Sequence, residues 1–159
     1  MKVTKKSLII QTDTHDLEAE FSIPNNSNHT PCVILCSPSP KFGGDMQNTV
    51  LIQISSELNQ LGIASLKFNY RGVGNSTGET SNGPGELQDT IEVIKFIESI
   101  QEIDGSRIGI AGYSFGAWMA LDSSTKNQKV KSICSIACPQ NKLSLFSTLE
   151  IIQPKLFII

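Results

Sequence analysis

The chain has 159 residues and a net charge of −2, with 39% hydrophobic and 18% charged residues. A chain of this length forms one domain with a sizeable core, and the composition excludes a disordered protein and argues against nucleic-acid binding. The apolar run at residues 8–10 is too short for a signal-peptide core and no run approaches a membrane span, so a cytoplasmic protein without membrane contact is expected.

The first predicted elements are two strands, at residues 7–11 and 17–23. In the second strand apolar residues alternate with Glu18, Glu20 and Ser22, which is typical of a strand with one solvated face. The polar turn at residues 12–16 joins the two strands, so they are predicted to form a β-hairpin. His15 in this turn and His29 in the following polar loop are both predicted to be solvated surface residues.

Strands and helices then alternate along the chain. Residues 32–36 form a continuous apolar run, typical of a strand buried on both faces. Asp45 is predicted to cap a helix that ends at about Leu61, before Gly62. The buried face of this helix is predicted to consist of Val50, Leu51, Ile54, Leu58 and Leu61.

The second half of the chain continues the alternation. Strands are predicted at residues 63–70, 108–113 and 130–137, with a turn at Asp104 and Gly105. Helices are predicted at residues 86–100, with a stripe of Leu87, Ile91, Ile94 and Ile97, and from 117 to about 124. A short amphipathic piece at residues 143–152 precedes an apolar strand that begins at residue 154.

This alternation predicts a mostly parallel sheet with helices on both faces. Ligand sites in such sheets lie at the carboxyl ends of the strands. Three loops are predicted at that edge: residues 37–44, residues 71–78 and the turn at residues 112–116.

The turn at residues 112–116 reads GYSFG and lies between an apolar strand and a helix. Strand, G-x-S-x-G and helix together place the serine on a sharp turn with its hydroxyl lifted above the sheet. The glycines let strand and helix approach closely, and the helix N-terminus carries partial positive charge. Ser114 is therefore the candidate nucleophile, against the alternative that the pattern arose by chance.

Two other patterns have simpler interpretations. The four cysteines form two C-x3-C pairs, Cys32 with Cys36 and Cys134 with Cys138, which could suggest a metal site. Both pairs lie within or at the end of predicted strands, so reduced core thiols are expected and no metal.

The loop RGVGNSTG at residues 71–78 lacks the spacing G-x-G-x-x-G and no helix opens directly after it, so phosphate binding is not expected.

Together the three loops resemble the α/β-hydrolase superfamily, and more narrowly a branch of small predicted serine hydrolases. That branch has an HPHP-x-FGG type loop after the third strand and an NYRGVG-x-S-x-G type loop after the fourth. Residues 69–78 (NYRGVGNSTG) match the second closely, while residues 37–44 (SPSPKFGG) carry Ser37 and Ser39 in place of both histidines. The resemblance covers essentially the whole chain and implies a single α/β-hydrolase domain at residues 1–159. Its sheet would be mostly parallel and doubly wound, with an N-terminal antiparallel hairpin.

The resemblance also implies a mechanism, in which Ser114 attacks an acyl carbonyl of an ester, thioester or related small-molecule substrate without a cofactor. The N–H of Phe115 and an N–H from the loop after the third strand would hold the oxyanion. Since prolines lack an N–H, that second donor is expected at Lys41, with Phe42 as the alternative. The family topology places the strands of Cys32 and Cys134 on either side of the serine strand, about 10 Å apart, which argues further against a shared metal.

The family's order is serine, acid, histidine; the acid would follow the strand that begins at Lys155, and the histidine would follow one strand later. No histidine follows Ser114 in this chain, and its carboxylates beyond that point are Asp122, expected to be solvated, and Glu150. We therefore expect an N-terminal fragment of a serine hydrolase that lacks the last strand or strands and helix.

Two alternatives stay open at this point. The chain could be a short protein that acts as a binding or interaction module, with the exposed edge of its last strand available for association into an oligomer. It could also be a serine enzyme that uses another base.

Overall fold

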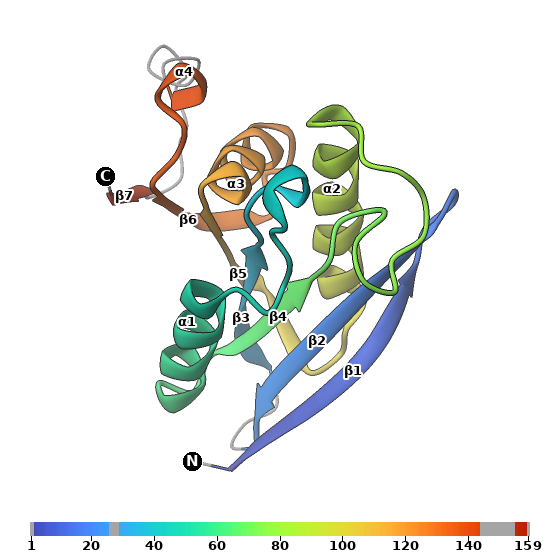
Figure 1. Cartoon of the computed structure of the whole chain (residues 1–159). Helices are drawn as coiled ribbons and strands as arrows, with labels where there is room; N and C mark the ends of the chain where they lie inside the picture. Colours follow the sequence, from blue (N-terminus) through green and yellow to red (C-terminus); the bar gives the residue numbers. More distant parts are fainter. Residues whose placement is uncertain (1, 26–28, 144–154, 159) are drawn as a thin grey trace.

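A seven-stranded sheet in the order β1-β2-β4-β3-β5-β6-β7 organises the molecule (Figure 1). The computed structural model describes residues 2–25, 29–143 and 155–158. β1 and β2 form an antiparallel hairpin, β2 is also antiparallel to β4, and all further neighbours are parallel. The predicted hairpin and the mostly parallel sheet are thus confirmed. The strands are β1 (Val3–Gln11), β2 (Asp16–Pro24), β3 (Thr30–Cys36), β4 (Ala64–Phe68), β5 (Ile103–Tyr113), β6 (Val130–Ile136) and β7 (Lys155–Ile158).

Helices cover both faces of the sheet, as predicted. They are α1 (Thr49–Gln60), α2 (Pro84–Ser99), α3 (Phe115–Lys126), the short α4 (Gln140–Leu143) and a 3-10 turn, η1 (Pro40–Phe42). Leu51 of α1 packs with Leu35 and Ala111 on one face. Side chains of α2 and α3 pack with Ile34 and Ile110 on the other face, because successive strand residues point to opposite sides.

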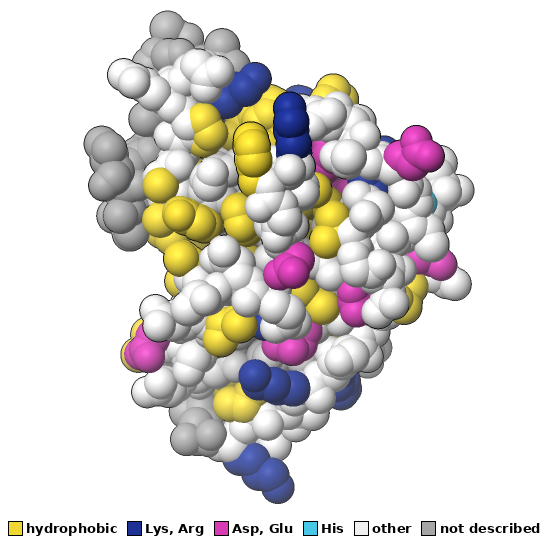
Figure 2. All heavy atoms as spheres, in the orientation of Figure 1, with side chains coloured by type: hydrophobic (Ala, Val, Ile, Leu, Met, Phe, Trp, Pro, Cys, Tyr) yellow, Lys and Arg dark blue, Asp and Glu magenta, His cyan; other side chains and the backbone are white. Residues whose placement is uncertain are grey.

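The handedness of the connections explains which helix lies on which face. Crossovers between parallel strands are right-handed, so the direction of the step along the sheet decides the face. The step from β3 through α1 to β4 runs opposite to the steps from β4 through α2 to β5 and from β5 through α3 to β6. α1 therefore lies alone on its face among these three helices, and Tyr113 and Cys134 on that face remain half-buried. Figure 2 shows hydrophobic side chains gathered in this region, between α1 and α4.

The start of α1 differs from its prediction. Asn48 is the N-cap, and its side chain accepts a hydrogen bond from the Val50 N–H at 3.0 Å. Asp45 instead accepts from the Gln47 N–H at 2.8 Å, in the turn before the helix. Aspartate and asparagine cap helices equally well, so the residue types alone do not separate the two positions.

The end and the buried face of α1 were predicted in part. Gly62 has φ of +78° just beyond the helix, as expected for a glycine at this position. Leu61, however, is 75% exposed, and the most buried face of α1 carries Leu51, Ser55 and Asn59.

The predicted buried stripe of α2 is confirmed in part, since Ile94 and Ile97 are fully buried. Leu87 and Ile91 are only half-buried, whereas Glu86, Asp89 and Thr90 are fully buried. The turn predicted at Asp104 and Gly105 lies inside β5, at a point where the pairing register with β3 shifts.

The amphipathic piece predicted at residues 143–152 lies almost wholly outside the described residues. Among the helices that the structure describes, none is long and apolar enough to cross a lipid bilayer.

Candidate active site

Ser114 lies at the sharp turn between β5 and α3, with φ of 57° and ψ of −116°. Its N–H donates to the carbonyl of Ile136 at 2.9 Å, which ties the turn to the end of β6. A methyl group on Gly112 would overlap the carbonyl of Gly116, and one on Gly116 would overlap the carbonyls of Cys36 and Ser37. Both glycines of the motif are thus required for strand, turn and helix to meet.

The predicted oxyanion donors lie in this turn and in the loop after β3. Phe115 is the first residue of α3, where backbone N–H groups have no intrahelical acceptor. The loop that carries Lys41 and Phe42 follows β3, which pairs with β5 up to Cys36 opposite Gly112.

The turn at η1 distinguishes the two candidates for the second donor. The Ser39 carbonyl accepts the N–H groups of Phe42 at 3.0 Å and Gly44 at 2.9 Å. The Phe42 N–H is therefore already paired, whereas the Lys41 N–H has no hydrogen-bond partner within the described part of the chain. This geometry favours Lys41 over Phe42 as the donor from this loop.

Ser37 and Ser39 stand where the resemblance implies histidines, and the turn at η1 forms with both serines. Ser37 is fully buried, and its hydroxyl has no hydrogen-bond partner among the described residues. Ser39 contributes its backbone carbonyl rather than its side chain. The loop conformation therefore depends on backbone hydrogen bonds that either residue type allows.

The loop at residues 69–78 is held by a carboxylate from the hairpin. Glu18 accepts hydrogen bonds from the Asn75 N–H at 2.9 Å and from the side chains of Asn75 and Asn69 at 2.7 and 2.8 Å. The Asn75 N–H has the largest effect and, together with the two side-chain bonds, holds the pKa of Glu18 below its ordinary value. A side chain on Gly74 would overlap Glu18 and Asn69, so this glycine allows the loop to close on the carboxylate.

The prediction that His15 is a solvated surface residue is wrong. Its side chain is only 6% exposed, and its Nε2 lies 2.8 Å from Oδ1 of the fully buried Asp89. The same carboxylate accepts the backbone N–H of Arg71 at 3.0 Å and its guanidinium at 2.6 Å. A buried carboxylate is stable only with such partners. Here His15 of the hairpin turn and Arg71 of the loop after β4 provide them.

His15 is nevertheless too far away to serve Ser114. It precedes β2, and β2 and β5 are separated by three strand spacings, or about 14 Å. His29 is exposed, as predicted, and its carbonyl accepts from Arg107. Asp122 lies on α3 and pairs with Lys126 at 3.2 Å, whereas Glu150 lies outside the described residues.

The four cysteines are free thiols, and β3 and β6 flank β5 as the resemblance implied. Cys32 and Cys36 are fully buried, and burial raises the pKa of the Cys36 thiol to about 12. Cys134 and Cys138 are half-buried. No cluster of histidine, cysteine and carboxylate side chains suited to a metal ion occurs in residues 2–25, 29–143 and 155–158.

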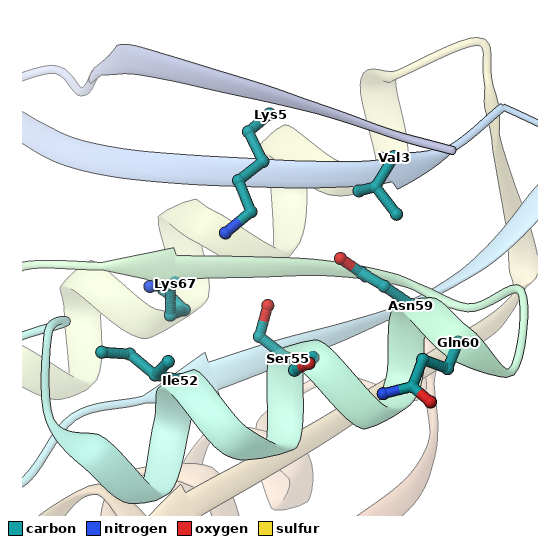
Figure 3. Close-up of a pocket in the computed structure, with 8 residues that line it drawn as sticks. Val3, Lys5, Ile52, Ser55, Asn59, Gln60 and Lys67 are labelled. Carbon is teal, nitrogen blue, oxygen red and sulfur yellow. The ribbon is translucent and has the colours of Figure 1, made fainter. Parts of the chain in front are cut away.

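A pocket of about 270 Å³ lies between α1 and the strands β1 and β4 (Figure 3). Its buried polar groups have partners within the protein, since Lys67 pairs with Glu20 at 3.0 Å and Ser55 with Ser65 at 2.7 Å. Neither the serine turn nor η1 contributes to its lining, which consists of Val3, Lys5, Ile52, Ser55, Ser56, Asn59, Gln60 and Lys67.

A mostly parallel sheet, an antiparallel N-terminal hairpin and a serine turn between β5 and α3 define an α/β hydrolase. Comparison with known families agrees, since residues 13–144 match the model of the X-Pro dipeptidyl-peptidase (S15) family. The chain belongs to this family.

Solved structures of similar proteins support the same class. The chain is 32% identical to an α/β serine hydrolase homologue from Coxiella burnetii, with a TM-score of 0.84, over 96% of this chain and 72% of that one. It is 28% identical to a putative α/β hydrolase from Agrobacterium tumefaciens, with a TM-score of 0.85, over 96% of this chain and 69% of that one.

Curated relatives are longer than this chain. An uncharacterized protein of Rickettsia prowazekii is 30% identical over 117 residues, which cover 74% of this chain and 49% of the relative. An uncharacterized 31.7 kDa protein of Escherichia coli is 31% identical over 137 residues, which cover 85% of this chain and 45% of the relative. The chain thus spans about half the length of these relatives.

Proposed function

We propose that the protein is a serine hydrolase in which Ser114 forms an acyl-enzyme with an ester, thioester or related acyl substrate. The observation that carries this proposal is the left-handed backbone of Ser114 at the turn into α3. Such strain in a residue other than glycine is stored mainly at functional sites, and here it presents the hydroxyl at the carboxyl edge of the sheet.

The proposed reaction has two balanced steps. The Ser114 oxygen bonds to the acyl carbon, the bond from that carbon to the leaving group breaks, and the serine proton passes through a base to the leaving group. Water then attacks the acyl-enzyme, releasing the acid and returning a proton to Ser114. The N–H groups of Phe115 and Lys41 would stabilise the oxyanion in both steps.

The base and its orienting acid are proposed to belong to the part of the relatives' length that this chain does not span. Two observations support this. The chain covers 49% and 45% of the length of the curated relatives. His15 pairs with Asp89, and its strand, β2, lies three strand spacings from β5, which leads into Ser114. A longer form of the protein would then contain a further histidine that reaches Ser114.

We further propose an open site for small or exposed acyl groups, because residues 138–153 after β6 are too few for a substantial lid. Peptides, which the sequence left open beside esters and thioesters, are also proposed for testing, since the matched family is described as X-Pro dipeptidyl-peptidase.

The experiment compares full-length protein, wild type and Ser114→Ala, using a fluorophosphonate probe, 4-nitrophenyl acetate and an Xaa-Pro anilide. Labelling and ester hydrolysis should both fall by about a thousandfold or more in Ser114→Ala. Ser56→Ala, which removes an exposed hydroxyl on α1, should leave both unchanged. Labelling that survives Ser114→Ala would contradict the nucleophile.

The location of the base has its own test. The chain of residues 1–159 should show little Ser114-dependent turnover of 4-nitrophenyl acetate, because it holds no histidine near Ser114. Robust Ser114-dependent hydrolysis by this chain would contradict the proposed position of the base without contradicting the nucleophile.

A further inference from the structure

Trp118, one helical turn after Ser114, forms a contact with Lys142 that the proposed chemistry does not use. Trp118 lies one turn into α3, and its backbone N–H donates to the Ser114 backbone carbonyl at 3.4 Å. Its ring packs edge-to-face on Phe115, with centroids 5.5 Å apart. The Lys142 ammonium lies 3.9 Å from the centre of the Trp118 ring.

The sheet order places this contact on a definite side of the nucleophile. β3 and β6 are the two neighbours of β5. η1, with Lys41, follows β3, and α4, with Lys142, follows β6. The two lysines therefore belong to loops on opposite sides of Ser114, and α4 begins four residues after the carbonyl of Ile136 that holds the Ser114 N–H.

The charge of Lys142 has no carboxylate partner among the described residues, although its side chain is half-buried. The buried carboxylates of α2 are engaged elsewhere: Glu86 with the loop at residues 80–83, and Asp89 with Arg71 and His15. An aromatic face removes part of the hydration shell of the cation that lies on it. Such a cation attracts an anion more strongly than a fully hydrated cation does.

We propose that Lys142, held on Trp118, is a carboxylate-binding subsite, so that the substrate carries a negative charge near its scissile acyl bond. This inference rests on the proposed function, because it assigns the substrate class of that same site. Contact with the ring uses one side of the ammonium and leaves N–H donors on its other side for a carboxylate. Trp118 acts as a positioning residue, since it holds the lysine beside the turn without touching the carboxylate.

The single tryptophan of the chain makes the subsite directly observable. The experiment titrates the chain with benzoate and with its neutral analogue benzamide, and follows Trp118 fluorescence. Benzoate should give a saturable change in fluorescence. Benzamide should bind at least tenfold more weakly or give no change. Equal responses to both, or a linear response to benzoate that Lys142→Met leaves unchanged, would overturn the subsite.

Variants separate the subsite from general charge effects. Lys142→Met should weaken benzoate binding about tenfold or more, and Lys142→Arg should retain it. Lys126→Met removes the same charge at the far end of α3, where Lys126 pairs with Asp122, and should bind benzoate as wild type does. Benzoate binding by Lys142→Met that equals wild type would contradict the proposal.

A second measurement uses the full-length protein and compares kcat/KM for 4-acetoxybenzoate with that for 4-acetoxybenzamide. Wild type should prefer the charged ester, and Lys142→Met should reduce that preference about tenfold. Labelling of Ser114 without any preference would overturn the subsite and leave the hydrolase intact. Saturable benzoate binding without Ser114 labelling would support the subsite and contradict the proposed function.

Discussion

Ser114 has a backbone conformation, with φ of 57° and ψ of −116°, that residues other than glycine rarely adopt. Holding a serine there costs about 1–3 kcal/mol, which the surrounding hydrogen bonds and packing must offset. Ser114→Gly should therefore unfold with a free energy about 1 kcal/mol higher than Ser114→Ala. Chemical denaturation of the two variants measures this difference, and equal stabilities would mean that the turn is not strained.

Gly116 lies against the carbonyls at the end of β3, where an added methyl group would overlap the Cys36 oxygen. Gly116→Ala should lower the free energy of unfolding by about 1–3 kcal/mol, because helix and strand would have to move apart. Gly105→Ala is the matched control, since nothing lies within 4 Å of the added group. The control should stay within about 0.5 kcal/mol of wild type in urea denaturation.

At the scale of elements, Glu86 ties the loop before α2 to that helix. Its carboxylate accepts from the N–H groups of Gly83 and Ser81 and from the hydroxyls of Thr80 and Ser81. Burial alone would raise the pKa of Glu86, but the hydrogen bonds from Thr80, Gly83, Ser81 and its own N–H together lower it.

A lowered pKa in the folded state makes this carboxylate a source of acid sensitivity. Its stabilisation is complete above the unfolded pKa of 4.5 and is lost as the pH falls through the lower folded value. Glu86→Gln should cost about 1–3 kcal/mol at pH 7 and flatten the loss of stability below pH 4.5. Urea denaturation at pH 3 to 7 tests this, and an unchanged acid limb would contradict the assignment.

Asp89 joins three elements: the hairpin turn through His15, the loop after β4 through Arg71, and α2. Asp89→Asn should lower the free energy of unfolding by about 3–5 kcal/mol, because it leaves the Arg71 charge without its carboxylate. Asp122→Asn breaks only a partly exposed pair with Lys126 and should cost no more than about 1 kcal/mol. Equal losses in the two variants would show that the buried network is no more stabilising than a surface pair.

The sequence predicted the type of nearly every element but not the partners of its polar residues. Apolar periodicity identified the hairpin and the helices correctly, because these patterns depend on neighbours close in the chain. The pair of His15 and Asp89 spans 74 residues, so no local pattern could show it. One signal was present, since Glu86, Thr90, Val93 and Ile97 follow helical spacing and lie on one buried face of α2.

For the whole molecule, the alternation of strands and helices predicted a mostly parallel sheet, and the resemblance to α/β hydrolases implied that the strand before the Lys41 loop lies beside the serine strand. The sequence already favoured Lys41 over Phe42 as the second oxyanion donor, but the hydrogen bond from the Phe42 N–H to the Ser39 carbonyl, which supports that preference, depends on the turn geometry and was not predictable. Lys142 was also missed, since a lysine in a short helical piece has no sequence pattern that relates it to Trp118.

The layering of the whole molecule predicts the reactivity of its four thiols. Cys32 and Cys36 are fully buried, whereas Cys134 and Cys138 are half-buried. Burial raises the pKa of all four, so reaction should need alkaline pH even at the accessible positions.

When the folded chain is treated with a small disulfide reagent at pH 8.5, the thiols of Cys134 and Cys138 should be modified first. Cys32 and Cys36 should react at least about a hundredfold more slowly, because the sheet must open before the reagent can reach them. Mass spectrometry of peptides from timed samples assigns each site, and urea-unfolded chain, in which all four should react alike, is the control. Modification of Cys32 as fast as Cys134 would contradict the placement of β3 in the interior of the sheet between β4 and β5.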